Sequence, residues 1–383
     1  MFVYADNAAT TRVLPKVLEA MLPYFTEQYG NPSSTYPLGQ EASRALITSR
    51  ETIARLLGCQ PREITFTSGG SESDNQALRT AAAWGKAHGR TRLIASAIEH
   101  HAILHTLEAL QAEGYSVTLL PANREGQVEP AALEQALTPE TALVSVMTAN
   151  NETGALQPIK KLAALAHAQG ALFHTDAVQA LGHIPVTLKN GDIDFLSGSA
   201  HKFHGPKGVG FLFAKQGIAL ESLIFGGEQE RGKRAGTENV PGIVGMAAAL
   251  EEAARNLDAH AEKMAAARNT LEQQLLALPG TRVHSGQVPR LPGHLNMAFD
   301  GVPAEALLPV LGMAGICVSA GSACASGSPE PSHVLLALGC TPEEAKCSLR
   351  FSLGDDITRE QVDWTAATVI REVQRLRKLE HRL

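Results

Sequence analysis

Lys202 lies in the segment Ser199–Gly208 (SAHKFHGPKG), and Asp176 precedes it at the end of a predicted strand. A lysine after small and polar residues, with an aspartate at an earlier strand end, suits a pyridoxal phosphate site. The lysine amine forms a Schiff base with the cofactor aldehyde, and the aspartate keeps the pyridine nitrogen protonated so that the ring accepts electrons. Alternatively, Lys202 is a solvated loop lysine and Asp176 caps a helix. Other segments must therefore decide between these interpretations.

A glycine-containing segment, Thr67–Asp74 (TSGGSESD), follows a predicted strand over 64–67 and opens a predicted helix. Glycines such as Gly70 allow a close approach to an anion, and free N–H groups at a helix start attract phosphate. Ser71 also fits a capping box with Asp74, the structural alternative. No Gly-Lys-Ser/Thr follows, so the segment is not a nucleotide P-loop.

Three further polar side chains come at or just after predicted strand ends: His100, Asn151 and Gln179. The imidazole of His100 could lie on a cofactor ring and exchange protons near neutral pH. The amide of Asn151 could bind the phenolic oxygen of the cofactor or a substrate carboxylate, and Gln179 could also serve the phenolic oxygen. A surface histidine and a simple turn are the alternatives.

A threonine in a basic loop and an arginine in a strand also need an assignment. Thr237 lies in a basic, glycine-containing loop, where Thr and Arg side chains could contact a phosphate or simply be solvated. Arg350 lies in an otherwise apolar predicted strand, so it either grips a carboxylate bidentately or forms a buried ion pair. His201 and His204 could begin a metal site, but no third ligand is evident, and we predict none.

Cys324 lies among small residues (Ser319–Ser328, SAGSACASGS), which predicts an exposed, flexible loop. A thiol there is accessible for nucleophilic attack. The chain has five cysteines, an odd number, and no C-x-x-C pair, so neither a disulfide framework nor a zinc site is indicated. The other cysteines are expected to be small buried hydrophobes in a reducing cytoplasm.

Length and composition limit the class of protein. The 383 residues favour two domains, and 44% hydrophobic with 19% charged residues is typical of a globular protein. The net charge of −6, without a long run of one sign, does not indicate binding to nucleic acid or a membrane surface. We read neither a signal peptide nor a membrane span, and expect a cytoplasmic protein.

Strand-like and helix-like segments alternate, which predicts an α/β fold with a largely parallel sheet flanked by helices. A nearly unbroken run of helix formers over 241–278 could link this large domain to a second one. A smaller α+β layer follows it. The predicted helices are 40–57, from about 73, 304–313 and 359–379, and the predicted strands are 64–67, 92–97, 116–120, 142–147, 171–175, 194–197, 208–213, 294–299 and 348–352.

Together these segments resemble the cysteine desulfurases, within the class V aminotransferase-like, fold-type I pyridoxal phosphate enzymes. The likeness runs from Asp6–Thr11 (DNAATT) to Arg350–Gly354 (RFSLG). It is nearest to the nitrogenase-type and housekeeping iron–sulfur branch, whose catalytic loop ends in the residues found here at Glu330–His333 (EPSH). The resemblance implies a large cofactor-binding domain over 12–258. It also implies a small domain from 1–11 and 259–383 that carries the cysteine loop.

The resemblance also implies roles for single residues. Lys202 matches the Schiff-base lysine, Cys324 the cysteine that becomes a persulfide, and His100 the histidine stacked on the ring. The remaining matches bind the cofactor or the substrate: Asp176 (pyridine nitrogen), Gln179 (phenolic oxygen), Gly70, Ser71, Ser199 and His201 (phosphate), Thr237 (phosphate of the other subunit), and Asn151 and Arg350 (substrate carboxylate). Because Thr237 would act across subunits, a homodimer is implied.

The implied reaction converts L-cysteine to L-alanine and places sulfur on Cys324. The sulfur then passes to an acceptor protein such as an iron–sulfur scaffold. Three alternatives stay open: a selenocysteine lyase or other pyridoxal phosphate-dependent lyase or aminotransferase, a non-catalytic scaffold, and, more distantly, a metal hydrolase using His201 and His204. Ala200, Ala320 and Ala325 depart from the residues usual in the family, and whether Cys324 ligates a cluster is left open.

Overall fold

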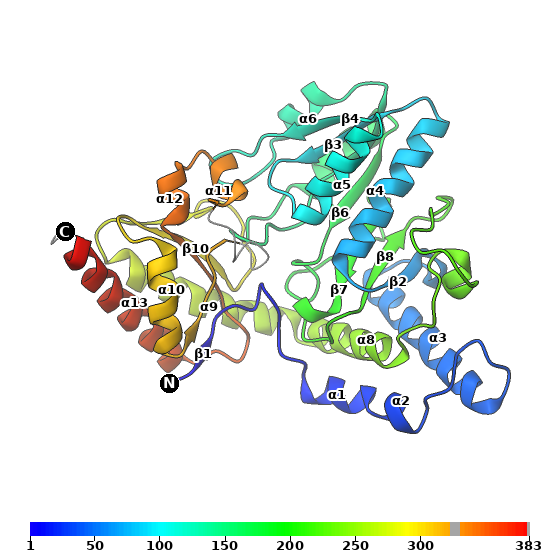
Figure 1. Cartoon of the computed structure of the whole chain (residues 1–383), viewed down its shortest axis with the longest axis horizontal. Helices are drawn as coiled ribbons and strands as arrows, with labels where there is room; N and C mark the ends of the chain where they lie inside the picture. The colour runs from blue at the N-terminus through cyan, green and yellow to red at the C-terminus, as the bar shows by residue number, and fades with distance from the viewer. Residues whose placement is uncertain (322–329, 381–383) are drawn as a thin grey trace.

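A seven-stranded sheet forms the centre of the larger half of the molecule (Figure 1). The computed structural model describes residues 1–321 and 330–380. The strand order is β2-β8-β7-β6-β5-β3-β4, and the strands are parallel except β8, which is antiparallel to both its neighbours. The strands are β2 (Ile64–Thr67), β3 (Arg92–Ser96), β4 (Ser116–Leu120), β5 (Thr141–Ser145), β6 (Leu172–Asp176), β7 (Phe195–Ser199) and β8 (Gly210–Ala214).

Alternate residues of the central strands enter two separate cores, one on each face of the sheet. Phe195 of β7 contributes to the core under α4 and α5, whereas the next residue, Leu196, contributes to the core under α3, α7 and α8. This period of two is what a strand covered on both faces requires. The helices of this half are α1 (Pro15–Met21), α2 (Pro23–Thr26), α3 (Pro37–Leu57), α4 (Gly70–Ala87), α5 (His101–Ala112), α6 (Pro130–Ala136), α7 (Ile159–Ala168) and α8 (Val240–Arg255).

The smaller half combines two short sheets with helices. Strands β9 (Thr281–His284), β10 (His294–Phe299) and β12 (Ser348–Ser352) form an antiparallel sheet, and β1 (Val3–Tyr4) pairs in parallel with β11 (Ile316–Cys317). Its helices are α9 (Leu257–Leu276), α10 (Ala304–Met313), α11 (His333–Ala337), α12 (Pro342–Lys346) and α13 (Arg359–Glu380). The predicted α/β fold is confirmed, and the boundaries at 11/12 and 258/259 stay a prediction.

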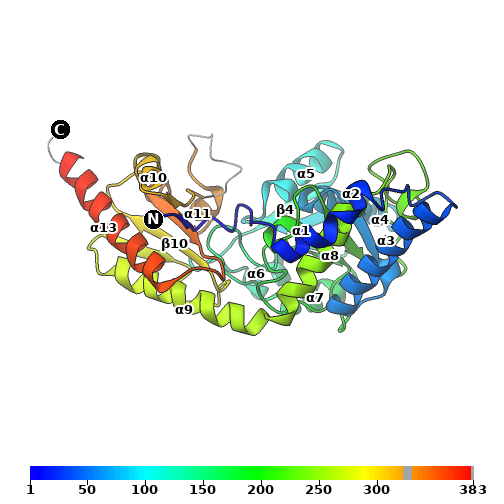
Figure 2. The same ribbon diagram turned by 90° about the horizontal axis from the view of Figure 1, so that it is seen from below.

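The long helix expected over 241–278 is two helices, α8 and α9, which meet at Asn256 (Figure 2). Asn256 leaves the helical conformation, with φ −117° and ψ 15°. Leu250 of α8 is buried in the core of the large sheet, whereas Leu271 of α9 is buried in the core of the small domain. A break at asparagine, a weak helix former, lets each helix follow its own core.

The start of α4 also differs from the expectation. The helix begins at Gly70, earlier than predicted, and its N-cap is Gly69, without a side-chain cap. The expected capping box of Ser71 with Asp74 is wrong, because both residues lie inside the helix and the Asp74 side chain is buried. Glu72 accepts a hydrogen bond from the N–H of Ser68 instead. Within residues 1–321 and 330–380, no helix is both long and apolar enough to cross a membrane.

Candidate active site

The candidate residues meet where parallel strands end. Asp176 is the last residue of β6, and Ser199 is the last residue of the adjacent strand β7. Lys202 follows at once in a single 3-10 turn, Ala200–Lys202. Ligands of open α/β sheets bind at the carboxyl ends of strands, so this edge is the expected place for a site.

A glycine turn between β2 and α4 forms one wall of the site. Gly69 has φ 155° and ψ −174°, a conformation open essentially to glycine alone. A β-carbon on Gly70 would lie 2.7 Å from Val178 Cγ2, with Ser199 Cβ at 3.8 Å. The helix start is therefore pressed against the loops that carry Asp176 and Lys202. Its first N–H groups, which have no intrahelical partner, suit a phosphate.

The N-terminal segment closes the site from the other side. Lys202 Nζ donates hydrogen bonds to the carbonyl oxygens of Ala8, at 2.6 Å, and Ala9, at 2.9 Å. Gln179 Nε2 donates to the same Ala8 oxygen at 3.0 Å. The predicted lysine and the predicted phenolic-oxygen partner thus converge on one backbone atom, and Thr10 Oγ1 lies 3.1 Å from His201 Nδ1.

Asp176 is buried, with its Oδ1 accepting a 2.8 Å hydrogen bond from the N–H of Val178. Burial raises the pKa of its carboxyl to about 6, while the Val178 N–H and the charge of Lys202 act in the opposite direction. The group is therefore ionised at neutral pH, as a partner for a protonated ring nitrogen must be.

His100 is the N-cap of α5, and its Nδ1 accepts a 3.1 Å hydrogen bond from the N–H of Ala102. Burial, and then the charge of Lys202, lowers its pKa to about 4. The ring is therefore a neutral imidazole at pH 7. With Nδ1 acting as the acceptor, the proton resides on Nε2.

Arg350 forms the buried ion pair that was one of its two expected roles, and its guanidinium still has a nitrogen available for a ligand. Its side chain is 1% exposed, and Nη2 lies 2.8 Å from Asp6 Oδ1. Nη1 donates to the carbonyl oxygen of Asn151 at 3.0 Å, which brings the two predicted carboxylate-binding residues together. Nε has no hydrogen-bond partner among the described atoms. The turn itself is made by Asn150, whose Oδ1 accepts from the N–H groups of Glu152 and Thr153.

Cys324 lies outside the described residues, but contacts on either side of 322–329 are clear. Ser319 and Arg350 exchange backbone hydrogen bonds of 3.2 and 2.7 Å. Ser332 Oγ donates to Glu152 Oε2 at 2.5 Å. Both flanks of the cysteine segment are thus fixed beside Asn151 and Arg350.

The remaining candidates are not all gathered into this site. His201 and His204 turn to Thr10 and to the carbonyl oxygen of Arg12, respectively. In the part of the chain that the structure describes, no group of three or more His, Cys, Asp or Glu could hold a metal. Thr237 is exposed in the segment between β8 and α8.

Two sets of residues around the site had no assigned role in the sequence analysis. Asp6 and the Ala8 carbonyl belong to the segment DNAATT, whose small and polar residues after a strand were the available signal. His174, two residues before Asp176 on the same face of β6, bonds Ser145 Oγ at 2.8 Å and Ser197 Oγ at 3.1 Å. Asp74 Oδ1 lies 3.7 Å from His174 Nε2. His174 had no sequence signal beyond its place in an apolar strand, and the sequence suggested only a capping role for Asp74.

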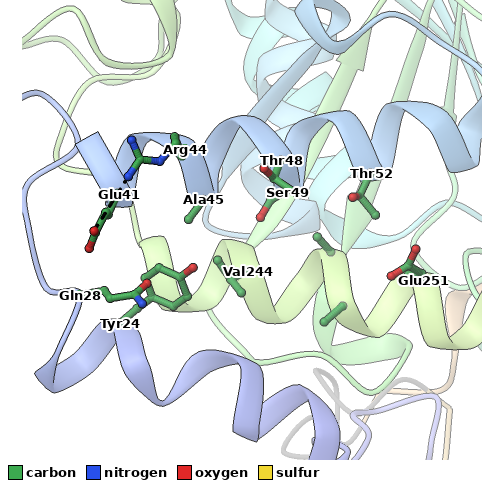
Figure 3. A pocket seen from close by; sticks show the side chains of 12 residues that line it. Tyr24, Gln28, Glu41, Arg44, Ala45, Thr48, Ser49, Thr52, Val244 and Glu251 are labelled. Carbon is green, nitrogen blue, oxygen red and sulfur yellow. Dashed lines mark ion pairs between the residues drawn. The ribbon is translucent and has the colours of Figure 1, made fainter. Parts of the chain in front are cut away.

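A separate cavity of about 520 Å³ lies between α2, α3 and α8 (Figure 3). Tyr24, Glu41, Arg44 and Glu251 are among its lining residues, and Arg44 and Glu41 lie 3.9 Å apart. None of the candidate active-site residues lines this cavity.

The donors of the site fit pyridoxal phosphate. An ionised carboxylate, a lysine amine, a neutral imidazole and a glycine-opened helix start match the ring nitrogen, aldehyde, ring face and phosphate of that cofactor. Gly70, whose β-carbon would strike Val178, shows why the phosphate wall requires glycine.

Comparison with known proteins identifies the family of the chain. Residues 3–364 match the family model described as aminotransferase class-V. The cysteine desulfurase IscS of Clostridium botulinum strain Hall is 46% identical over 380 residues, covering 98% of this chain and 96% of the relative.

Two solved structures are also similar. One titled NifS-like protein has a TM-score of 0.91 and 39% identity, covering 98% of this chain and 100% of the other. One titled SspA in complex with cysteine has a TM-score of 0.81 and 34% identity, covering 92% and 99%. The chain belongs to the class-V aminotransferase family.

Proposed function

We propose that this chain is a pyridoxal phosphate-dependent cysteine desulfurase. The observation that carries the proposal is the convergence of Lys202, Gln179 and Asp176 at the ends of β6 and β7, next to the glycine-opened start of α4. The relatives named cysteine desulfurase, and the SspA structure titled as a complex with cysteine, support L-cysteine as the substrate.

Each candidate site residue has its own role in holding the cofactor. Lys202 would bind the cofactor aldehyde covalently, Asp176 would hold the ring nitrogen, Gln179 would hold the phenolic oxygen, and His100 would face the ring. Gly70, Ser71, Ser199 and His201 would bind the phosphate, together with Thr237 of the partner subunit. When bound, the cofactor supplies the electron sink that makes the substrate C–S bond labile.

The substrate is handled by a second set of residues. Arg350 and Asn151 bind the α-carboxylate of L-cysteine, and Lys202 moves the proton at its α-carbon. The neutral imidazole of His100 offers its Nε2–H as a hydrogen-bond donor, because its Nδ1 already accepts from the N–H of Ala102. The Cys324 thiolate attacks the substrate sulfur, so one C–S bond breaks and one S–S bond forms. The products are L-alanine and a Cys324 persulfide.

The persulfide sulfur passes to an acceptor protein, such as an iron–sulfur scaffold. Location in the cytoplasm stays a prediction from the sequence. A homodimer is supported by exposed apolar side chains along this part of the chain: Leu18 in α1, Leu22 between α1 and α2, and Phe25 in α2. Sedimentation of the wild-type chain and of Leu22→Asp tests the dimer, which the substitution should weaken.

Mass spectrometry of the Cys324 peptide, after exposure of the purified protein to L-cysteine without reductant, tests the reaction. One added sulfur on Cys324 with L-alanine in solution is the expected result. An unmodified Cys324 with cofactor bound would show that the chain acts on a different amino acid.

A further inference from the structure

Arg50 and Glu230 form a buried bidentate ion pair. Arg50 Nη2 lies 2.5 Å from Glu230 Oε1, and Nη1 donates to Oε2 at 2.8 Å. The two side chains are 11% and 3% exposed. Arg50 belongs to α3, and Glu230 lies in the segment between β8 and α8. Paired hydrogen bonds of this kind fix orientation as well as distance.

The same pair covers the edge of the large sheet. β2 is an outermost strand, and Glu230 Oε2 accepts a 2.9 Å hydrogen bond from the N–H of Phe66 in β2. Arg50 Nη1 donates to the carbonyl oxygen of Ile64 at 2.7 Å, and its guanidinium lies 4.3 Å from the centre of the Phe66 ring. Since β2 runs directly into the Gly69–Gly70 turn, the ion pair ties the segment 228–236 to the phosphate wall.

The backbone of this segment is strained at the pair. Glu230 has φ 49° and ψ 33°, and Arg231 has φ 61° and ψ 40°. Two successive residues other than glycine in the left-handed region are rare, because the β-carbon crowds the backbone there. Such strain persists only where surrounding contacts over-determine it, and it is concentrated at functional positions.

Two more contacts hold the segment on its way to α8. Arg234 Nε lies 3.0 Å from Glu72 Oε1 in the first turn of α4. Asn239 Oδ1 accepts a 3.0 Å hydrogen bond from the N–H of Gly242 and so caps α8. Thr237, which is exposed, lies between these fixed points. The segment is therefore a preformed support for that residue.

We propose that Arg50 and Glu230 are a positioning pair, which holds the strained turn so that Thr237 presents its hydroxyl to the cofactor phosphate in the partner subunit. The inference rests on the proposed function. It adds the pair of residues that fixes the position of Thr237 relative to the partner subunit. Neither residue touches the cofactor. Their effect passes through Thr237.

The first test compares the affinity of full-length, cofactor-stripped Arg50→Lys and Glu230→Gln for pyridoxal phosphate and for pyridoxal, which lacks the phosphate. Absorbance of the bound cofactor is the readout. A lost phosphate contact should weaken pyridoxal phosphate binding roughly tenfold or more and leave pyridoxal binding unchanged. An equal loss for both ligands would show a general structural defect and overturn the inference.

Arg55→Gln is the matched control. It lies on the same helix α3 and removes an ion pair of 2.8 Å with Glu251, but Arg55 is 60% exposed. Exposed pairs contribute little. Its affinity for both ligands should equal that of the wild-type chain.

A double-mutant cycle tests the route of the effect. If Arg50 acts through Thr237, Arg50→Lys should add little to the loss already caused by Thr237→Ala. Full additivity of the two losses would overturn the inference. The cycle stays informative if Glu230→Gln fails to fold, because it uses only Arg50 and Thr237.

Mixed dimers separate the inference from the proposed function. With Arg50→Lys and Lys202→Ala on one chain and a wild-type partner, the intact Lys202 site receives the altered segment and should bind pyridoxal phosphate weakly. With the two changes on opposite chains, the intact site receives a wild-type segment and should bind normally. The reverse pattern would overturn the inference. A phosphate-specific loss in a protein that forms no persulfide would refute only the proposed reaction.

Discussion

Arg350 Nη2 lies 2.8 Å from Asp6 Oδ1, so strand β12 and the N-terminal segment meet in a buried ion pair beside the candidate substrate site. The pair keeps the guanidinium in place while its Nε has no partner among the described atoms. An arginine held in this way is prepared for a carboxylate.

Arg350→Lys should therefore raise the KM for L-cysteine by about ten- to a hundredfold, as expected for loss of a charged hydrogen bond, with the cofactor absorbance unchanged. Steady-state kinetics of L-alanine formation measures this. Arg282→Lys, which alters half-exposed ion pairs with Asp300 and Glu344, is the control. A wild-type KM in Arg350→Lys would remove Arg350 from the substrate site.

Lys202→Ala should lose the visible absorbance of covalently bound cofactor and all measurable turnover, because Lys202 supplies both the amine and the proton transfer. Absorbance of the purified variant and assays of L-alanine check the two parts. Lys207→Ala changes an exposed lysine a few residues later and should behave as wild type. Normal L-alanine formation by Lys202→Ala would refute its role.

Cys324→Ala should retain the cofactor absorbance and form no persulfide, since only the nucleophile is removed. Cys317→Ala is the control, a partly buried thiol on β11. Peptide mass spectrometry after exposure to L-cysteine distinguishes them. Sulfur transfer to an acceptor at the wild-type rate by Cys324→Ala would show that another residue carries the sulfur.

Affinity for pyridoxal phosphate should fall as the pH drops below about 6, because the Asp176 carboxyl, whose pKa is raised to about 6 by burial, becomes protonated there. A protonated carboxyl cannot support the positive charge on the ring nitrogen. Titration of the cofactor-stripped chain with pyridoxal phosphate at several pH values between about 5 and 8 measures the effect. In Asp176→Asn this component of the pH dependence should vanish, and its persistence would assign it to another group.

Acid should destabilise the fold through His174. Burial lowers its pKa to about 3, below the ordinary value near 6.5 that it regains on unfolding. The unfolded chain thus binds more protons between these values, so stability is full above about pH 6.5 and falls by about 1.4 kcal/mol per pH unit below it. Denaturant unfolding from pH 7 to 5 should show a shallower slope in His174→Gln, and an unchanged slope would exclude His174 as a source.

Much of the site could be predicted because reactive side chains and the ends of strands can both be recognised in the sequence. Lys202, Asp176 and the glycine turn at Gly70 each follow a strand, and the carboxyl ends of parallel strands meet at one edge of a sheet. The position of the break at Asn256 could not be predicted, because it depends on which core each half of the helix covers.

The sequence by itself determined the α/β alternation, because strand and helix periodicity are local properties. It also predicted the cofactor residues and the nucleophile, from reactive side chains and from the resemblance to a known family. Only the tertiary structure decided that the Ala8 carbonyl receives Lys202 and Gln179, that Asp6 pairs with Arg350, and that Glu230 caps the edge of β2. These contacts join residues more than a hundred positions apart. No periodicity or spacing in the sequence predicts these contacts, because they form only when segments far apart in the chain come together in the folded protein.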